Sequence, residues 1–417
     1  MSFINTIKKE NLIDISLGLF LASLPLPFAF INITFGLFIL SCILSYKELK
    51  FNLNKAILLP IAYYLLCVIS LTFSINQHET GKYLSKSIFF LIVPLCFLFL
   101  PKINIKRRNF IFDIFSYAMV FASIFYLIRA TYRFITTGDS DHFFYHSLVS
   151  LKVNAIYVSL FIGVAFIYLV NKSFKKNYEY IFSIILFAFL ILLSSKNVII
   201  ITLIALLFFI FKTIRLNKKK PVLILLIIIG LFTIPLSKKI YERFQLEFVN
   251  TQENIVLEDG VINVSHKNAW VQEKFDNNHY FNGTAFRIYQ IRVFKDIISE
   301  NNKFITGYGA SAVQQKIKAK LLNDGLVDYY IELNFHNQYL QSFATLGILG
   351  FLLLLSIQII SWVKSIKRKD ALFIYFTLLV TSIMFTESLF ERQRGIVFFV
   401  TLYCIFHHTF FNKSKAN

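Results

Sequence analysis

The chain has 417 residues, of which 56% are hydrophobic and only 16% are charged, and its mean hydropathy is +0.62. Soluble domains carry about 25% charged residues, so this composition excludes a soluble globular protein, a disordered chain and a small disulfide scaffold. The 43 basic residues outnumber the 23 acidic ones, an excess that indicates a nucleic-acid partner only in a soluble protein.

Apolar segments of membrane-spanning length recur along the chain. A helix that crosses a bilayer needs about 20 apolar residues, and the sequence predicts an all-α, polytopic α-helical membrane protein with about twelve transmembrane helices. The first segment follows Lys8 and Lys9 like a signal peptide, but Asp14 interrupts it and no small-residue cleavage site follows, so we expect an uncleaved span. The predicted spans are roughly 12–28, 30–46, 56–73, 85–100, 109–131, 151–170, 178–194, 197–211, 221–236, 338–363, 371–387 and 395–411.

The basic residues orient these spans. When the connections are counted alternately from an inside N-terminus, the inside segments hold 23 basic residues and the short outside segments hold eight. Lys and Arg near span ends favour the cytoplasmic side, so both termini are expected in the cytoplasm and the chain in a bacterial inner membrane. The basic excess is therefore a topology signal, and it indicates no nucleic-acid partner.

One long loop is predicted on the outside, which in a bacterium is the periplasm. It divides the chain into spans one to nine over 1–236, the loop over 237–337, and spans ten to twelve with a cytoplasmic tail over 338–417. Its apolar spacing predicts a helix over 284–299, and Gly307 and Gly309 indicate a turn. A short helix over 238–248, an irregular stretch over 250–282, and a helix over 311–322 that Ser311 caps complete the expected loop.

Polar side chains gather where span ten begins. His336 comes just before the helix, and Gln338, Gln341, Ser342 and Thr345 follow on neighbouring parts of one face. Polar groups at this depth are costly unless they face protein or a water-filled cavity. The positive end of the helix dipole favours a neutral imidazole that accepts a proton. An interfacial His that caps the helix, beside amides that pack helices together, explains the same pattern.

Three basic residues on the outer side are candidate ligands for an anion. Arg287 has no acid at helical spacing, so its charge is available, although a solvated Arg or a tertiary ion pair explains it equally well. Arg292 has Asp296 four residues further on, and a local ion pair accounts for it. Lys196, in the turn between spans seven and eight, either reaches lipid phosphates or points inward as a fixed cation.

The last outside turn is rich in charge. Glu387, Glu391, Arg392 and Arg394 either pair with one another and stiffen the turn or support a catalytic cavity. Elsewhere the sequence has no Gly-rich phosphate loop and no zinc-type Cys/His spacing, so we expect no metal and no cofactor. All four cysteines fall in predicted spans, which argues against disulfides. They are Cys42, Cys67, Cys96 and Cys404.

The stretch His336-Asn337-Gln338-Tyr339-Leu340 followed by Gly347-Ile348-Leu349-Gly350 resembles the signature of the O-antigen ligase/polymerase family. In that family a His-Asn-x-x-Leu stretch ends a large periplasmic loop, and Gly-x-x-Gly begins the next span. Arg287 with the Gly307-x-Gly309 turn, and the segment 386–395, are similar to further family features. The resemblance covers roughly 190–400, while the first 150 residues agree only in topology.

The resemblance implies a C-type glycosyltransferase-like membrane enzyme that needs no metal and no cofactor. It would transfer a glycan from undecaprenyl diphosphate, among membrane lipids, to a hydroxyl of lipid A core, of another glycan or of a protein. His336 would act as general base, and Arg287 would stabilise the departing diphosphate. The residues implied in substrate binding are Lys196, Asn337, Gln338, Arg292, Glu387 and Arg392.

One position departs from the family pattern, and two other functions stay open. Family members often carry Ser-Arg where this chain has Ser195-Lys196, and lysine keeps the charge without the planar fork of arginine. Twelve spans are also common in polysaccharide flippases and other transporters. A transporter should carry polar residues deep within its spans, whereas this chain gathers them at the outer interface. A structural assembly partner is the third possibility, because fold similarity alone does not define function.

Overall fold

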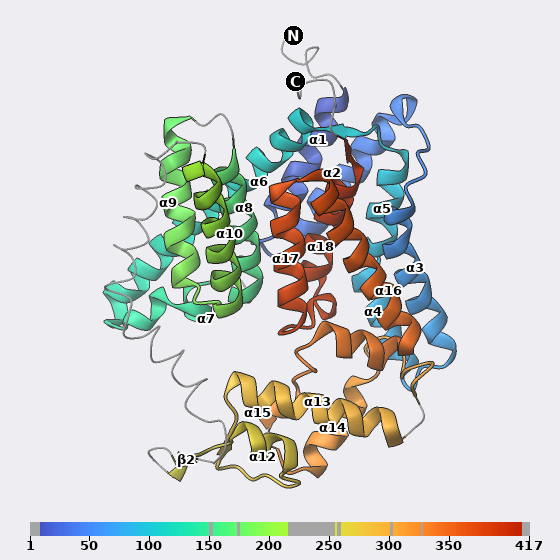
Figure 1. Ribbon diagram of the computed structural model, residues 1–417, viewed down its shortest axis with the longest axis vertical. Helices are drawn as coiled ribbons and strands as arrows, with labels where there is room; N and C mark the ends of the chain where they lie inside the picture. Colours follow the sequence, from blue (N-terminus) through green and yellow to red (C-terminus); the bar gives the residue numbers. More distant parts are fainter. Residues whose placement is uncertain are drawn as a thin grey trace.

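The computed structural model describes residues 9–149, 153–172, 176–215, 255–256, 260–300, 303–326 and 328–410. These residues are almost entirely helical (Figure 1). Four stretches are both long and apolar enough to cross a bilayer, and six shorter helices are apolar as well. The expected fold class, an all-α membrane protein, is therefore confirmed at this level. The four long stretches are Lys55–Thr72, Gln77–Phe99, Ile105–Thr137 and Gln338–Arg368.

Two groups of helices, from the first and last parts of the chain, form the bundle. The first group is α1 (Lys9–Ala22), α2 (Phe28–Leu44), α3 (Lys55–Ile69), α4 (Gln77–Ser87), α5 (Phe89–Phe99), α6 (Ile105–Thr137), α7 (Tyr145–Leu148), α8 (Ala155–Asn171), α9 (Asn177–Leu192) and α10 (Lys196–Arg215). The last group is α16 (Gln338–Arg368), α17 (Ala371–Met384) and α18 (Gln393–His408). Short 3-10 turns are η1 (Tyr46–Glu48), η2 (Ser70–Thr72), η3 (Ser140–Phe143) and η5 (Leu389–Glu391).

Helices occupy the positions of eleven predicted spans. The ninth, 221–236, lies outside the described residues, as does the helix expected over 238–248, so the twelve-span topology stays a prediction. The span predicted over 85–100 contains the apolar helix α5. The polar helix α4 precedes it and extends the helical stretch of membrane-crossing length back to Gln77, which hydropathy alone does not indicate.

Side-chain caps set where several of these helices begin. The Asn54 side chain accepts a hydrogen bond from the Ala56 amide at the start of α3, and Asn104 caps α6 in the same way. α6 ends where Gly138 adopts a left-handed conformation with φ of 71°. Asn at the N-cap and Gly just past the C-terminus are the residues these positions favour.

One end of the bundle is tied together by contacts between distant segments. The Asn54 amide donates to the His407 carbonyl oxygen at 3.0 Å, and Arg108 pairs with Asp370. Two short parallel strands join there as well, β1 (Ile103–Asn104) with β5 (Thr409–Phe410). The N-terminal ends of α3, α6 and α17 and the C-terminal end of α18 therefore meet at this end of the bundle.

A separate unit lies beyond the opposite end of the bundle (Figure 1). Its helices are α12 (His266–Val271), α13 (Gly283–Glu300), α14 (Gln314–Asn323) and α15 (Asp328–Ile331). Its strands β2 (Ile255–Val256), β3 (Ile262–Asn263) and β4 (His279–Tyr280) form a small sheet, antiparallel between β2 and β3 and parallel between β3 and β4. The expectation of an irregular stretch over 250–282 is therefore wrong, since that stretch holds these strands and α12.

The helix predicted over 284–299 is confirmed as α13. Tyr289, Val293 and Ile297 recur at helical spacing and are buried in a hydrophobic cluster of their own, separate from the core of the bundle. The helix expected from Ser311 instead begins at Gln314. Ser311 does not cap it, because its φ of 60° turns the backbone away, and its hydroxyl lies 3.2 Å from a carboxylate oxygen of Glu391.

Arg292 does not form the expected ion pair with Asp296. Its guanidinium lies 3.7 Å from Asp324, which also accepts a hydrogen bond from Tyr289 at 2.9 Å, while Asp296 pairs with Lys320 at 3.3 Å. The packing of α14 against α13 brings these partners closer than the local helix does. Burial, together with Asp324, raises the pKa of Tyr289.

Helix α16 is broken at Gly347. Its φ of 66° and ψ of −164° are not helical, so neighbouring backbone groups lose their partners within the helix. The turn that Gly307 and Gly309 predicted crosses α16 at this point and supplies replacements. These hydrogen bonds are Tyr308 N–H to Ala344 C=O, Gly309 N–H to Thr345 C=O and Ile348 N–H to Phe304 C=O, each 2.9 Å long.

Candidate active site

His336 is held in place just outside α16. Asn337, rather than the His, caps the helix by accepting hydrogen bonds from the Tyr339 and Leu340 amides, at 3.0 and 3.1 Å. His336 adopts a left-handed conformation with φ of 46°, and its amide donates to the Asn334 side chain at 2.9 Å. The imidazole therefore projects from a fixed turn.

A carboxylate faces this imidazole. Nδ1 of His336 lies 3.4 Å from Oε2 of Glu387, and the exposed fractions of the two side chains are 27% and 12%. Glu387 follows the end of α17. The backbone amide of Glu387 donates to the Ile383 carbonyl oxygen at 2.8 Å and fixes its position. A carboxylate at one ring nitrogen orients an imidazole and leaves the other nitrogen for a reacting group.

Arg287 reaches the same turn from α13. Its Nε and Nη2 donate to the carbonyl oxygen of Thr386 at 3.4 and 3.3 Å, and its Nη1 donates to the Gly283 carbonyl oxygen at 3.0 Å. Within the described residues Arg287 has no carboxylate partner. The residue it contacts comes immediately before Glu387, so Arg287 and His336 converge on one dipeptide.

The start of α10 contacts this turn as well. The amide of Asn197 donates to the Thr386 hydroxyl and to the Ser382 carbonyl oxygen, both at 3.0 Å. Lys196, the neighbouring residue in the chain, begins α10 and is partly buried. The structure thus brings α10, α13, the turn before α16 and the end of α17 together around residues 382–387.

Gln338 and Asn337 serve the architecture of this region. Gln338 is buried, and its amide donates to Ser342 at 2.9 Å while its oxygen accepts from the Phe390 amide at 2.7 Å. Because both ends of the amide are engaged, Gln338 joins α16 to the turn that carries Glu387. Asn337 uses its side-chain oxygen as the helix cap.

The charged residues of the last turn do not pair with one another as expected. Glu391 pairs with Lys86 of α4 at 3.3 Å and accepts from Gln341 of α16 at 3.3 Å. Arg394 donates to the Leu24 and Leu26 carbonyl oxygens, at 3.2 and 2.7 Å. Arg392 is exposed and precedes α18. Glu391 and Arg394 instead join this turn to other elements.

Arg292 lies on a different face of α13 from Arg287. Five residues separate them, which is roughly 140° around a helix with 3.6 residues per turn. Its Nη1 donates to the Trp270 and Gln272 carbonyl oxygens, at 3.2 and 2.6 Å, within the unit outside the bundle. These contacts give Arg292 a structural role there.

The sequence-based reasoning missed Asn197 and Thr386. Both are uncharged, so the charge pattern does not single them out, although each adjoins a residue that it does select. The arrangement combines an imidazole, a carboxylate that orients it, and a guanidinium with a carbonyl as its nearest partner. Such a group can remove a proton at one point and stabilise negative charge at another.

Comparison with known sequences relates the chain to one family. A sequence profile of the family described as O-antigen ligase matches residues 181–355, which include Lys196, Arg287 and His336. No curated protein sequence is significantly similar to the chain. The match confirms, over residues 181–355, the resemblance to the O-antigen ligase family found in the motifs.

Proposed function

We propose that this protein is a membrane glycosyltransferase that moves a glycan from undecaprenyl diphosphate to an acceptor hydroxyl. The match of residues 181–355 to the O-antigen ligase family supports glycan transfer in O-antigen biosynthesis. The observation that carries the chemistry is the convergence of His336, Glu387 and Arg287 on one turn. The acceptor classes that fit are lipid A core, another glycan and a protein hydroxyl.

In this proposal His336 is the general base. Its free ring nitrogen takes the proton from the acceptor hydroxyl as the hydroxyl oxygen attacks the anomeric carbon of the lipid-linked glycan. The bond between that carbon and the diphosphate oxygen breaks, and the diphosphate leaves with the bonding electrons. Glu387 holds the ring and stabilises the imidazolium that forms, in the way that the acid of a catalytic triad does.

Arg287 and Lys196 are proposed to stabilise the leaving group. Charge accumulates on the diphosphate as the bond breaks, and fixed cations that already face this charge lower the barrier. Lys196 precedes Asn197, and the side-chain amide of Asn197 donates a hydrogen bond to the Thr386 hydroxyl. The backbone of Lys196 is therefore held near the same turn. Arg392 is proposed to contact the substrate from the exposed rim, and Asn337, Gln338 and Arg292 to position the elements around it.

The site is proposed to face the periplasm. Contacts of Arg287 and of Ser311 tie the outer unit to the end of the bundle opposite β1 and β5. Described parts of three predicted inside segments, at Asn54, residues 103–108 and Asp370, lie at the β1 and β5 end, and basic residues near span ends favour the cytoplasmic side. This orientation places both termini in the cytoplasm and the transfer at the outer face of the inner membrane.

The test is transfer by purified variants in proteoliposomes that contain lipid-linked glycan and acceptor. We expect His336→Ala and Arg287→Ala each to lower the rate at least about 100-fold, because each removes a group that acts in the transition state. His78→Ala is the matched control, since His78 is exposed on α4, and it should transfer at the wild-type rate. Wild-type transfer by His336→Ala and Arg287→Ala would refute the assigned site.

A further inference from the structure

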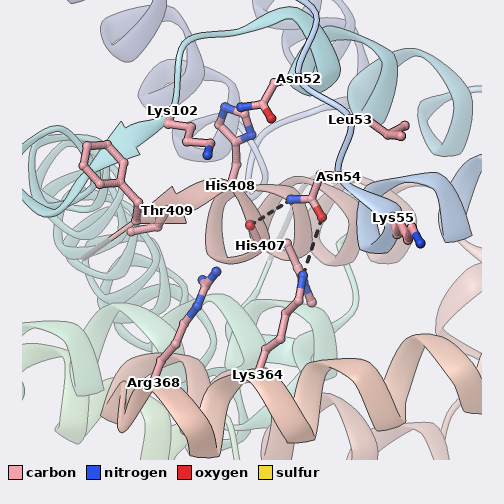
Figure 2. A pocket seen from close by; sticks show the side chains of 11 residues that line it. Asn52, Leu53, Asn54, Lys55, Lys102, Lys364, Arg368, His407, His408 and Thr409 are labelled. Atoms are coloured by element: carbon pink, nitrogen blue, oxygen red, sulfur yellow. Dashed lines mark hydrogen bonds between the residues drawn. The ribbon is translucent and has the colours of Figure 1, made fainter. Parts of the chain in front are cut away.

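A cavity of about 230 Å³ lies at the β1 and β5 end of the bundle, away from the candidate active site. Eleven residues line it, and they come from the start of α3, the end of α16, the end of α18 and the segment before β1 (Figure 2). A buried water needs only roughly 10–15 Å³. The cavity therefore has room for a group much larger than one water molecule.

The charge of the cavity is positive. Lys55, Lys102, Lys364 and Arg368 line it, and no carboxylate is among the lining residues of the described chain. Figure 2 shows Lys364 and Arg368 extending from α16, and Lys102 from the opposite side, toward the same space. Four cations thus come from three separate segments of the chain.

The partners of these cations are neutral. Lys364 donates to the Asn54 side chain at 3.5 Å, and Arg368 donates to the Phe406 carbonyl oxygen at 2.7 Å. Where the chain is described, none of the four forms an ion pair with Asp or Glu. A preference for positive charge on the cytoplasmic side explains cations at this end, but it does not explain why they converge. Like charges repel one another across a partly enclosed space, so an anion between them would stabilise the arrangement.

Exposed apolar side chains adjoin one wall of the cavity. Leu53 lines the cavity and is exposed, and Phe51, which precedes the lining residue Asn52, is exposed and packs on Phe99 with ring centroids 5.5 Å apart. Exposed apolar side chains of a membrane protein face lipid tails. A basic pocket beside such a surface suits a ligand with a phosphate head and an acyl tail, and basic pockets between transmembrane helices bind phospholipid head groups in this way.

We propose that this cavity binds the phosphate group of an anionic phospholipid of the inner leaflet. Lys364 and Arg368 hold the phosphate oxygens from α16, Lys102 holds them from the segment before β1, and Lys55 lies at the edge. The lipid joins α3, α16 and α18, whose ends already meet there through the bond from Asn54 to the His407 carbonyl. The proposal is independent of glycan transfer.

The test measures lipid retention by the delipidated, full-length protein in detergent, using native mass spectrometry. The probes are phosphatidylglycerol, phosphatidylcholine and inorganic phosphate. Wild type should retain phosphatidylglycerol in preference to phosphatidylcholine. The double variant Lys364→Gln with Arg368→Gln should bind phosphatidylglycerol about 30-fold more weakly, if each cation contributes the usual amount near a membrane surface.

Matched controls separate the cavity from general surface charge. Lys106→Gln with Lys367→Gln removes the same charge from exposed positions at this end that do not line the cavity, and it should weaken binding less than about threefold. Lys364→Arg with Arg368→Lys keeps both charges and should retain the lipid. Lys55→Gln with Lys102→Gln probes the opposite wall if the first variant does not fold.

Three outcomes would overturn the proposal. If the cavity variant and the control variant lose affinity for phosphatidylglycerol equally, only the surface charge of this end attracts the lipid. Equal retention of phosphatidylglycerol and phosphatidylcholine by wild type would remove the head-group preference. Saturable binding of inorganic phosphate that the cavity variant loses, without any lipid preference, would assign the site to a soluble phosphate compound instead.

Discussion

At the scale of single residues, the contact between His336 and Glu387 is the feature with the most chemical consequence. It joins a residue from the turn before α16 to one from the end of α17, 3.4 Å apart. The sequence selects His336, Arg287 and Lys196 by residue type and by motif. It does not reveal that Glu387 faces His336, because they are fifty-one positions apart in the chain and only tertiary packing brings them together.

Glu387 can be tested as a positioning residue. Glu387→Gln should lower transfer at least about tenfold, because the amide does not stabilise the imidazolium that forms during proton transfer. Glu387→Asp keeps the charge and should recover part of the rate, which a purely structural role would not require. Glu332→Gln, an exposed change in the outer unit, is the control. An unchanged rate in Glu387→Gln, measured in the proteoliposome assay, would contradict the role.

At the scale of elements, the break in α16 fixes the height at which the outer unit meets the bundle. The Gly-x-x-Gly motif marks this region in the sequence, but hydropathy indicates one uninterrupted span over 338–363. A hydropathy pattern reports only the polarity of side chains, so it does not show this break in the backbone. The hydrogen bonds lost within α16 are replaced by bonds to the backbone of another segment, so no polar side chain is needed there. Irregular backbone at membrane depth is tolerated only where protein or water supplies such replacements.

Gly347→Ala should destabilise the protein by more than about 2 kcal/mol. A Cβ there would lie 1.9 Å from the Ile305 carbonyl oxygen, and the backbone conformation is one that only glycine adopts readily. Gly36→Ala in α2 is the matched control, because a Cβ there meets nothing within 4 Å. Thermal unfolding in detergent compares the two, and equal midpoints would disprove the strain.

Asp324→Asn tests the core of the outer unit. Asp324 is buried and faces Tyr289, Arg292 and Lys320, so the change leaves Arg292 and Lys320 without their shared acid and should cost about 3 kcal/mol of local stability. The exposed pair of Glu332 with Lys318 should contribute less than about 1 kcal/mol. Hydrogen exchange of α13 and α14 amides measures both, and equal protection in Asp324→Asn and Glu332→Gln would contradict the expectation.

The spacing of apolar residues predicted some elements of the outer unit and not others, for physical reasons. The helix over 284–299 was predictable because an amphipathic face carries its own signal along the chain. The start of α14 was not, since Ser311 has the residue type of a cap but a left-handed backbone. Strands of two residues, such as β3 and β4, are too short for any alternation to be detected.

At the scale of the whole molecule, the orientation in the membrane is open to a direct test. In a cysteine-free background, Glu273→Cys on the outer unit should react with a membrane-impermeant maleimide in spheroplasts, and Lys367→Cys should react only after lysis. Both side chains are exposed, so access depends on the side of the membrane. The reverse pattern would invert the topology that the basic residues predict.

The contacts of Thr386 have a practical consequence for anyone who dissects this protein. The hydrogen bonds from Arg287 and Asn197 end on a residue thirty-one positions beyond the stretch that the family profile covers. A fragment cut to that stretch would keep the imidazole and the guanidinium but lose the backbone that orients them. Inhibitor screens and antibody selections aimed at the transfer centre therefore need the intact chain, in detergent or a lipid disc, as their target.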